Sequence, residues 1–129
     1  MAAIELISHD NKRRAENRHA FVAKCSALLR EGVSVAIVDV VTTRRFNLYG
    51  ELLEMLGLAR ADGAPLPSIY AVACRWQHAG RGGRWRSWGY DLAIGRPLPT
   101  LPLWLSDDFV VPLNLEVGYE NACLDLRIA

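Results

Sequence analysis

The stretch of residues 4–41 constrains the fold more than any other part of the chain, because it reads as strand, helix, strand. Residues 4–7 form a short apolar run that contains one carboxylate, Glu5. Residues 20–30 have helical periodicity, and residues 33–41 form a nearly continuous β-branched run. Two strands joined by such a helix predict a parallel crossover, and so apolar a second strand is typical of burial on both faces. We therefore expect an α/β domain.

Composition is consistent with one soluble domain of 129 residues, 51% of them hydrophobic, that buries roughly two-thirds of its unfolded surface. The formal net charge of +1 gives no bulk-charge argument for binding nucleic acid or a membrane. The N-terminus lacks the shape of a signal peptide, and no run of about 20 apolar residues predicts a membrane span. Cys25, Cys74 and Cys123 lack metal-ligand spacing, so we expect free, mostly buried thiols in a cytoplasmic protein.

Two lysines stand out in a chain whose other basic residues are all arginines. Both Lys12 and Lys24 fall in the opening strand–helix unit. They are either surface residues placed there by chance, or residues of a site that needs a compact ammonium group rather than a planar guanidinium. Lys24 borders the apolar stripe of the predicted helix, so its head group can reach back over the sheet. That stripe consists of Phe21, Cys25, Leu28 and Leu29.

Glu5 is the other unusual residue of this unit. Strand alternation puts Glu5 and Ile7 on one face, and Ile4 and Leu6 on the other. A carboxylate in so short an apolar strand must lie at the strand end, be paired, or hold a metal ion. Glu5 is therefore a candidate for function as well as for structure.

These residues carry a resemblance to a known family. Glu5, the block Ser-His-Asp-Asn-Lys at 8–12, the block Phe-Val-Ala-Lys at 21–24 and a strand ending in Asp39 resemble the PD-(D/E)XK restriction-endonuclease-like superfamily. The chain is most similar to a bacterial branch of unknown function with Glu-x-x-Ser-Pro-x-Asn-Lys here, His9 replacing the proline. It is more distantly similar to the Uma group. The tail is similar to the same branch at residues 97–102, 111–115 and 124–128.

The resemblance implies a metal-dependent nuclease-like protein that acts on phosphodiesters with Mg²⁺ or Mn²⁺. It implies Glu5 as the metal ligand and Lys24 as the catalytic lysine, with Lys12 as the rival lysine. The superfamily also has an aspartate on an earlier strand, and only four residues precede Glu5. We therefore expect residues 1–129 to form one domain with a truncated restriction-endonuclease-like core and an incomplete site. The alternative is a non-catalytic interaction domain that retains this scaffold.

Two geometric expectations follow from the strand–helix unit. The head groups of Glu5 and Lys24 should face each other, while Lys12 points to solvent. The strand that carries Glu5 should keep a partly open edge, through which the protein forms a homodimer or binds a partner.

The rest of the chain predicts a helix over residues 48–56 capped by Asn47, an antiparallel hairpin and a last helix over residues 113–124. The hairpin strands are residues 69–76 and 85–94, joined by a loop at 77–84, and the prolines at 97–102 predict an extended edge segment. The complete sheet is expected to be mixed.

Arginines and tryptophans alternate around the predicted hairpin. This pattern resembles a stacking surface for single-stranded nucleic acid, although tryptophans on a hairpin also pack against a core. The candidate nucleic-acid-binding residues are Arg81, Arg84 and Arg86, beside Trp76, Trp85 and Trp88.

Overall fold

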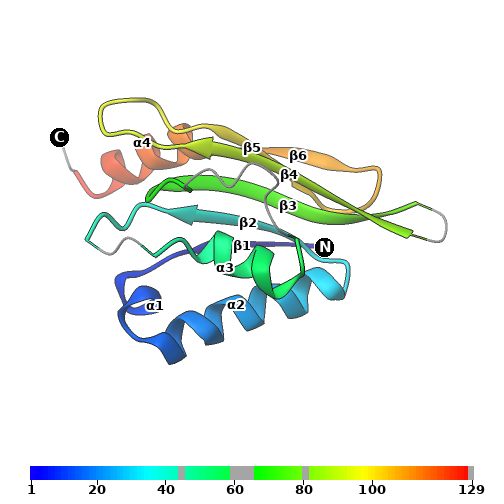
Figure 1. The fold of residues 1–129 in the computed structure, drawn as a ribbon. Helices are drawn as coiled ribbons and strands as arrows, with labels where there is room; N and C mark the ends of the chain where they lie inside the picture. The colour runs from blue at the N-terminus through cyan, green and yellow to red at the C-terminus, as the bar shows by residue number, and fades with distance from the viewer. Residues whose placement is uncertain (44–45, 59–65, 80–81, 128–129) are drawn as a thin grey trace.

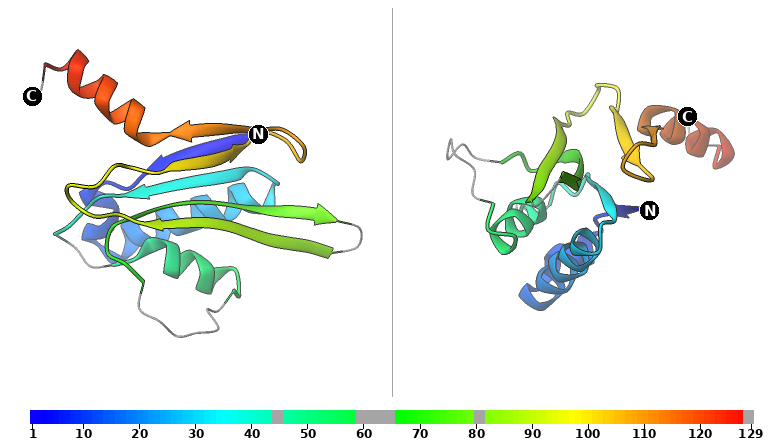
Figure 2. Two further views of the ribbon diagram at one scale, coloured as in Figure 1. Left: turned by 90° about the horizontal axis from the view of Figure 1, so that it is seen from above. Right: turned by 90° about the vertical axis from the view of Figure 1, so that its right-hand side faces the viewer.

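The computed structural model describes residues 1–43, 46–58, 66–79 and 82–127. A four-stranded mixed sheet carries helices on one face and a two-stranded hairpin on the other (Figures 1 and 2). The elements are β1 (Ala2–Leu6), α1 (His9–Arg13), α2 (Ala15–Arg30), β2 (Ser34–Asp39), α3 (Leu48–Met55), β3 (Tyr70–Ala79), β4 (Gly82–Asp91), β5 (Thr100–Trp104), β6 (Val110–Asn114) and α4 (Leu115–Asp125).

The large sheet has the strand order β1-β2-β3-β4. β1 and β2 are parallel, with Glu5 opposite Ile37, whereas β3 and β4 continue the sheet in antiparallel fashion. The predicted parallel crossover is confirmed, and all six residues of β2 are buried. The strand is shorter than the predicted run 33–41, since it ends at Asp39 and Val40 is exposed. β1 lies at the edge of the sheet, and its outer side has no strand neighbour among the described residues.

Local sequence signals fix the ends of the first helices. Ser8 and Asn11 form a capping box. The backbone N–H of Asn11 donates to Ser8 Oγ at 3.3 Å, and the backbone N–H of Ser8 donates to Asn11 Oδ1 at 2.8 Å. Arg14 is extended, with φ −129° and ψ 151°, and separates α1 from α2. α2 begins at Ala15, earlier than the predicted residue 20, and is followed by Gly32 at φ +82°, a conformation that favours glycine.

Each face of the sheet has its own core. Between sheet and helices, large side chains of α2, α3 and the strands interlock: Phe21, Val22, Cys25, Leu29, Val35, Ile37, Leu48, Leu52, Tyr70, Val72 and Cys74, together with Ile7 after β1. On the other face the buried residues are small, namely Ala36, Ala71 and Ala73, with Val38 and Leu101. These alanines let β5 approach the sheet closely.

The structure corrects the prediction for the hairpin and the tail. β3 and β4 run through residues 77–79 and 82–84 of the predicted loop, and β4 ends before Leu92 and Ile94. The end of the predicted edge segment belongs to β5, which pairs with β6 in a separate hairpin. The last helix begins at Leu115 rather than 113 because Asn114 caps it. Pro102 lies opposite Pro112, a non-hydrogen-bonded pair of the ladder in which the missing N–H groups cost no cross-strand bond.

The described residues contain no helix that is long and apolar enough to cross a membrane. α4 extends from the hairpin and buries none of its residues (Figure 2).

The cysteines differ in accessibility, which predicts their reactivity. All three are free; Cys25 and Cys74 are buried, and Cys123 is half-buried. Burial raises the pKa of Cys25 to about 12 and raises the pKa of Cys74 as well. Both buried thiols stay protonated and unreactive at pH 8. Titration with a thiol reagent should count one thiol, Cys123, in the folded protein and three after unfolding. Fast reaction of all three without denaturant would contradict this core.

Candidate functional site

Glu5 and Lys24 meet across the gap between β1 and α2. Lys24 Nζ lies 2.9 Å from Glu5 Oε2, although the residues are 19 positions apart in the sequence. The Lys24 side chain is 54% exposed and that of Glu5 is 19% exposed. The predicted meeting of these head groups is confirmed, whereas their catalytic roles stay a prediction.

The sequence places this pair by two periodicities. In β1, Ile4 is exposed and Ile7, which follows the strand, is buried, so Glu5 points to the helix-covered face. On α2, Lys24 borders the buried stripe and its ammonium lies 5.5 Å from the Phe21 ring centre. An ion pair this exposed contributes about 0.2–1 kcal/mol to stability. The Glu5–Lys24 pair therefore adds little to the stability of the fold.

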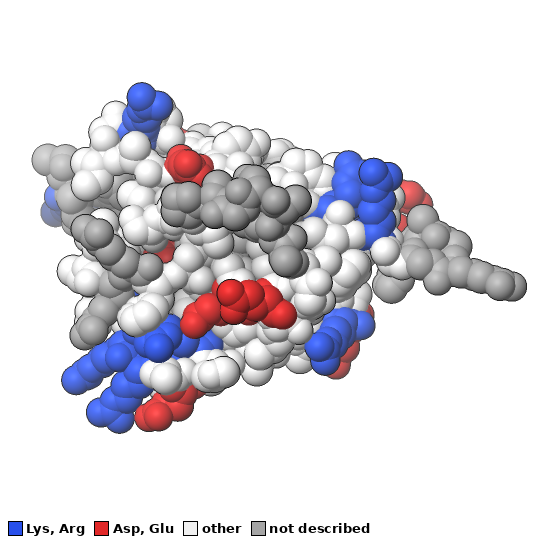
Figure 3. Space-filling model, viewed as in Figure 1, with Lys and Arg blue, Asp and Glu red and all other residues white. Residues whose placement is uncertain are grey.

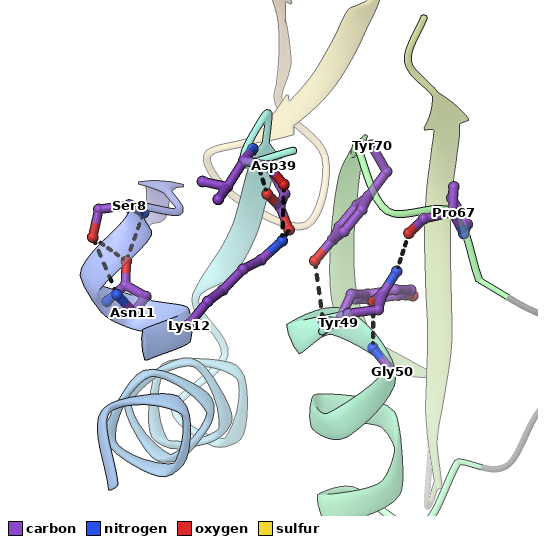
Figure 4. Close-up of polar contacts among 10 residues, drawn as sticks. Ser8, Asn11, Lys12, Asp39, Tyr49, Gly50, Pro67 and Tyr70 are labelled. Atoms are coloured by element: carbon purple, nitrogen blue, oxygen red, sulfur yellow. Dashed lines mark hydrogen bonds and ion pairs between the residues drawn. The ribbon is translucent and has the colours of Figure 1, made fainter. Parts of the chain in front are cut away.

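Lys12 lies elsewhere, and the expectation that it points to solvent is wrong. Its side chain is fully buried, and Nζ lies 2.5 Å from Asp39 Oδ2, also fully buried (Figure 4). The same ammonium donates to the Val41 carbonyl at 3.4 Å, while the Val41 amide donates to Asp39 Oδ1 at 3.0 Å. The reason is electrostatic: a carboxylate at the buried end of β2 needs a countercharge, and α1 supplies it.

The Lys12–Asp39 pair has a structural role. The pair joins α1 to the end of β2, and Arg18 adds a hydrogen bond of 3.2 Å to the Lys12 carbonyl. Two charges removed from water are stable only while each neutralises the other. Lys12 is therefore engaged in the core and is a poor candidate for a catalytic lysine.

The described residues do not fit a complete metal site. Mg²⁺ prefers oxygen ligands in octahedral geometry. Glu5 Oε2 is bonded to Lys24, and Asp39 is paired with Lys12. Within the described part of the chain, no group of three or more His, Cys, Asp or Glu residues could hold a metal ion. Glu5 stays a predicted ligand that belongs to no such group among the described residues.

The predicted arginine–tryptophan group is divided by the register of the hairpin. Trp76 and Trp85 are opposite each other on the helix-facing side, in an edge-to-face contact with ring centres 5.1 Å apart. Arg84 and Arg86 lie on the other face, because side chains alternate along a strand. Arg81 lies outside the described residues. The idea that all three tryptophans share a surface with the arginines is therefore wrong.

A different stack forms on the face of Arg86. The Arg86 guanidinium lies 5.6 Å from the Trp88 ring centre, and Trp88 is 6.0 Å from Trp104 of β5. Trp104 also contacts Arg75 of β3, whose guanidinium carbon lies 4.4 Å from the Trp104 ring centre. Arg75 Nη2 donates a hydrogen bond to Asp107 Oδ1 at 3.0 Å. Sequence reasoning missed Arg75 and Trp104. Alternation along β3 could have indicated Arg75, but Trp104 joins the stack only through tertiary packing.

No family model, curated protein or solved structure matches this chain. The family resemblance seen in the sequence therefore stays a prediction.

The chain's two lysines offer a matched test of the two ion pairs. Lys12→Met should lower the free energy of unfolding by about 3–5 kcal/mol, because it leaves Asp39 buried and unpaired. Lys24→Met, with the same side-chain change, should cost less than about 1 kcal/mol. Urea unfolding followed by tryptophan fluorescence measures both.

A double variant checks the cause. Lys12→Met with Asp39→Leu should recover most of the loss, because removing both charges removes the unpaired one. Equal losses for the two lysine variants would contradict the burial of Lys12.

Proposed function

We propose that this domain binds single-stranded nucleic acid without cutting it, on a scaffold of the nuclease-like type that the sequence resembles. One observation carries the proposal: Arg84, Arg86, Trp88 and Tyr90 form a row on one face of β4. Both arginines are exposed, Tyr90 is 44% exposed and Trp88 is half-buried.

The spacing of the row suits an extended strand of nucleotides. Alternate residues on a strand are about 6.6–6.8 Å apart, so the row covers about 20 Å. Guanidinium groups bind phosphates through paired N–H donors, and aromatic rings stack on bases of any identity. Trp104 packs beside Trp88, which orders the ring before a base arrives and reduces the entropy cost of binding.

The opposite face is a poorer surface for a polyanion. Acidic side chains gather over α3, and basic ones lie at the α1–α2 end (Figure 3). The acidic residues of α3 are Glu51 and Glu54. Charges of both signs close together give no continuous attraction for a phosphate backbone.

The non-catalytic half of the proposal rests on the state of Glu5. Its carboxylate is bonded to Lys24, and among the described residues it belongs to no group of three or more His, Cys, Asp or Glu side chains that could hold a metal ion. A single carboxylate binds Mg²⁺ weakly. The described part of the chain therefore supports nucleic-acid binding better than phosphodiester hydrolysis.

The second candidate is the metal-dependent nuclease that the resemblance implies. The convergence of Glu5 and Lys24 at the sheet edge favours it. Carboxylates from beyond the described residues, or from a second copy beside β1, would have to complete a site for Mg²⁺ or Mn²⁺. That ion would supply Lewis-acid activation of a phosphodiester, and Glu5 would be one of its ligands.

Binding is tested with a fluorescently labelled deoxythymidine oligonucleotide, followed by anisotropy at several salt concentrations. Trp88→Ala should weaken binding roughly 5- to 150-fold, because stacking is worth about 1–3 kcal/mol per base. Arg86→Gln should reduce the slope of log affinity against log salt by about 0.7, the value for one phosphate contact to a single strand. Arg14→Gln, which removes an exposed arginine from the α1–α2 junction, is the control and should change neither quantity.

Cleavage of plasmid and single-stranded DNA with Mg²⁺ or Mn²⁺ separates the two candidates. We expect none. Turnover that Glu5→Ala abolishes would favour the nuclease, and binding that survives Trp88→Ala unchanged would contradict the β4 row.

A further inference from the structure

A hollow of about 490 Å³ lies on the helix-facing side of β4, between that strand and α3. α3 lies beneath the part of the sheet that contains β3 and β4 (Figure 2). The hollow includes neither Glu5 nor Lys24. Arg84, Arg86 and Trp88 lie on the other face of β4, and Tyr90 is the member of the β4 row that also lines the hollow.

Small residues on β4 create the hollow. This face of the strand carries Trp85, Ser87, Gly89 and Asp91 in succession. Ser87 and Gly89 are exposed, and they lie opposite Cys74 and Val72. Leu48 and Leu52 of α3 belong to the core cluster that includes Val72 of β3, whereas Leu53 lines the hollow. A space therefore opens between the bulky side chains at either end.

The chemistry of the walls selects a kind of ligand. Tyr49, Tyr70 and Trp85 contribute aromatic surface, and Asp91 carries the only formal charge among the described lining residues. The Tyr70 hydroxyl accepts a hydrogen bond from the Tyr49 amide at 3.1 Å, and burial raises its pKa, so it adds no second negative charge. Aromatic rings and a carboxylate both attract cations, and this volume is typical of small-molecule sites.

We propose that this hollow binds an organic cation: a substituted ammonium or guanidinium group carried on an apolar body. The cation belongs either to a free small molecule or to a lysine or arginine side chain of a peptide that lies along β4. The second source is open because β4 has a strand neighbour on one side only among the described residues, which permits strand addition.

Benzyltrimethylammonium is the first probe, with benzyl alcohol and phenylacetate as the neutral and anionic comparators. Tryptophan fluorescence and amide shifts in ¹H–¹⁵N NMR measure binding. The cation should bind at least tenfold more tightly than either comparator and should shift the amides of Ser87 and Gly89. Equal affinity for benzyl alcohol, or no binding of the cation, would overturn the proposal.

Two variants locate the site. Asp91→Asn should weaken binding of the cation about 5- to 10-fold and remove its salt dependence. Gly89→Leu should abolish binding by filling the hollow; a Cβ at Gly89 meets Val72 Cγ2 at an ordinary 3.8 Å, and the backbone φ is not in the left-handed region. Gly83→Leu, on the same face of β4 but about 20 Å away, is the matched control and should bind as the parent does. Binding that survives Gly89→Leu would overturn the proposal.

A second binding experiment, with peptides, identifies the source of the cation. An acetylated Val-Thr-Lys-Val-Thr peptide is compared with the same peptide carrying norleucine in place of lysine. Binding of the lysine peptide alone, with protection of β4 edge amides, assigns a peptide side chain. Binding of benzyltrimethylammonium but neither peptide assigns a free small cation.

Discussion

The complete burial of β2 is the constraint that organises this molecule. A strand with six buried residues must have neighbours along both edges and cover on both faces. β1 and β3 supply the edges, α2 and α3 cover one face, and the β5–β6 hairpin covers the other. Because the strand ends in Asp39, its burial also demands a cation. Lys12 meets that demand and so determines where α1 lies.

The molecule places two lysine–carboxylate pairs in different environments. In the core, Lys12 and Asp39 depend on each other, since neither charge has access to water. At the sheet edge, Glu5 and Lys24 keep contact with solvent, and their attraction is screened. The exposed pair can exchange its partner at little cost, which is what a functional group requires, whereas the buried pair cannot.

Sequence periodicity was sufficient for the opening unit and insufficient for long-range contacts. The β-branched run at 33–41 and the helical stripe around Cys25 depend on local spacing, so the parallel crossover and the meeting of Glu5 with Lys24 could be predicted. The burial of Lys12 could not, because it depends on Asp39, a partner from another element. The contact of Trp88 with Trp104 also needed the position of β5. Prolines 102 and 112 concealed that hairpin, since proline normally argues against a strand.

The facing prolines of β5 and β6 also determine where further strands can add. Residues at non-hydrogen-bonded positions of a two-stranded ladder direct their N–H groups outward, so Pro102 and Pro112 each remove a donor from an outer edge of the hairpin. The small sheet is therefore a poor template for growth. Among the described residues, β1 of the four-stranded sheet has no strand neighbour on its outer side and no proline, and Ile4 and Leu6 are exposed there. Strand addition therefore meets fewer obstacles at the edge of the large sheet than at the edges of the small one.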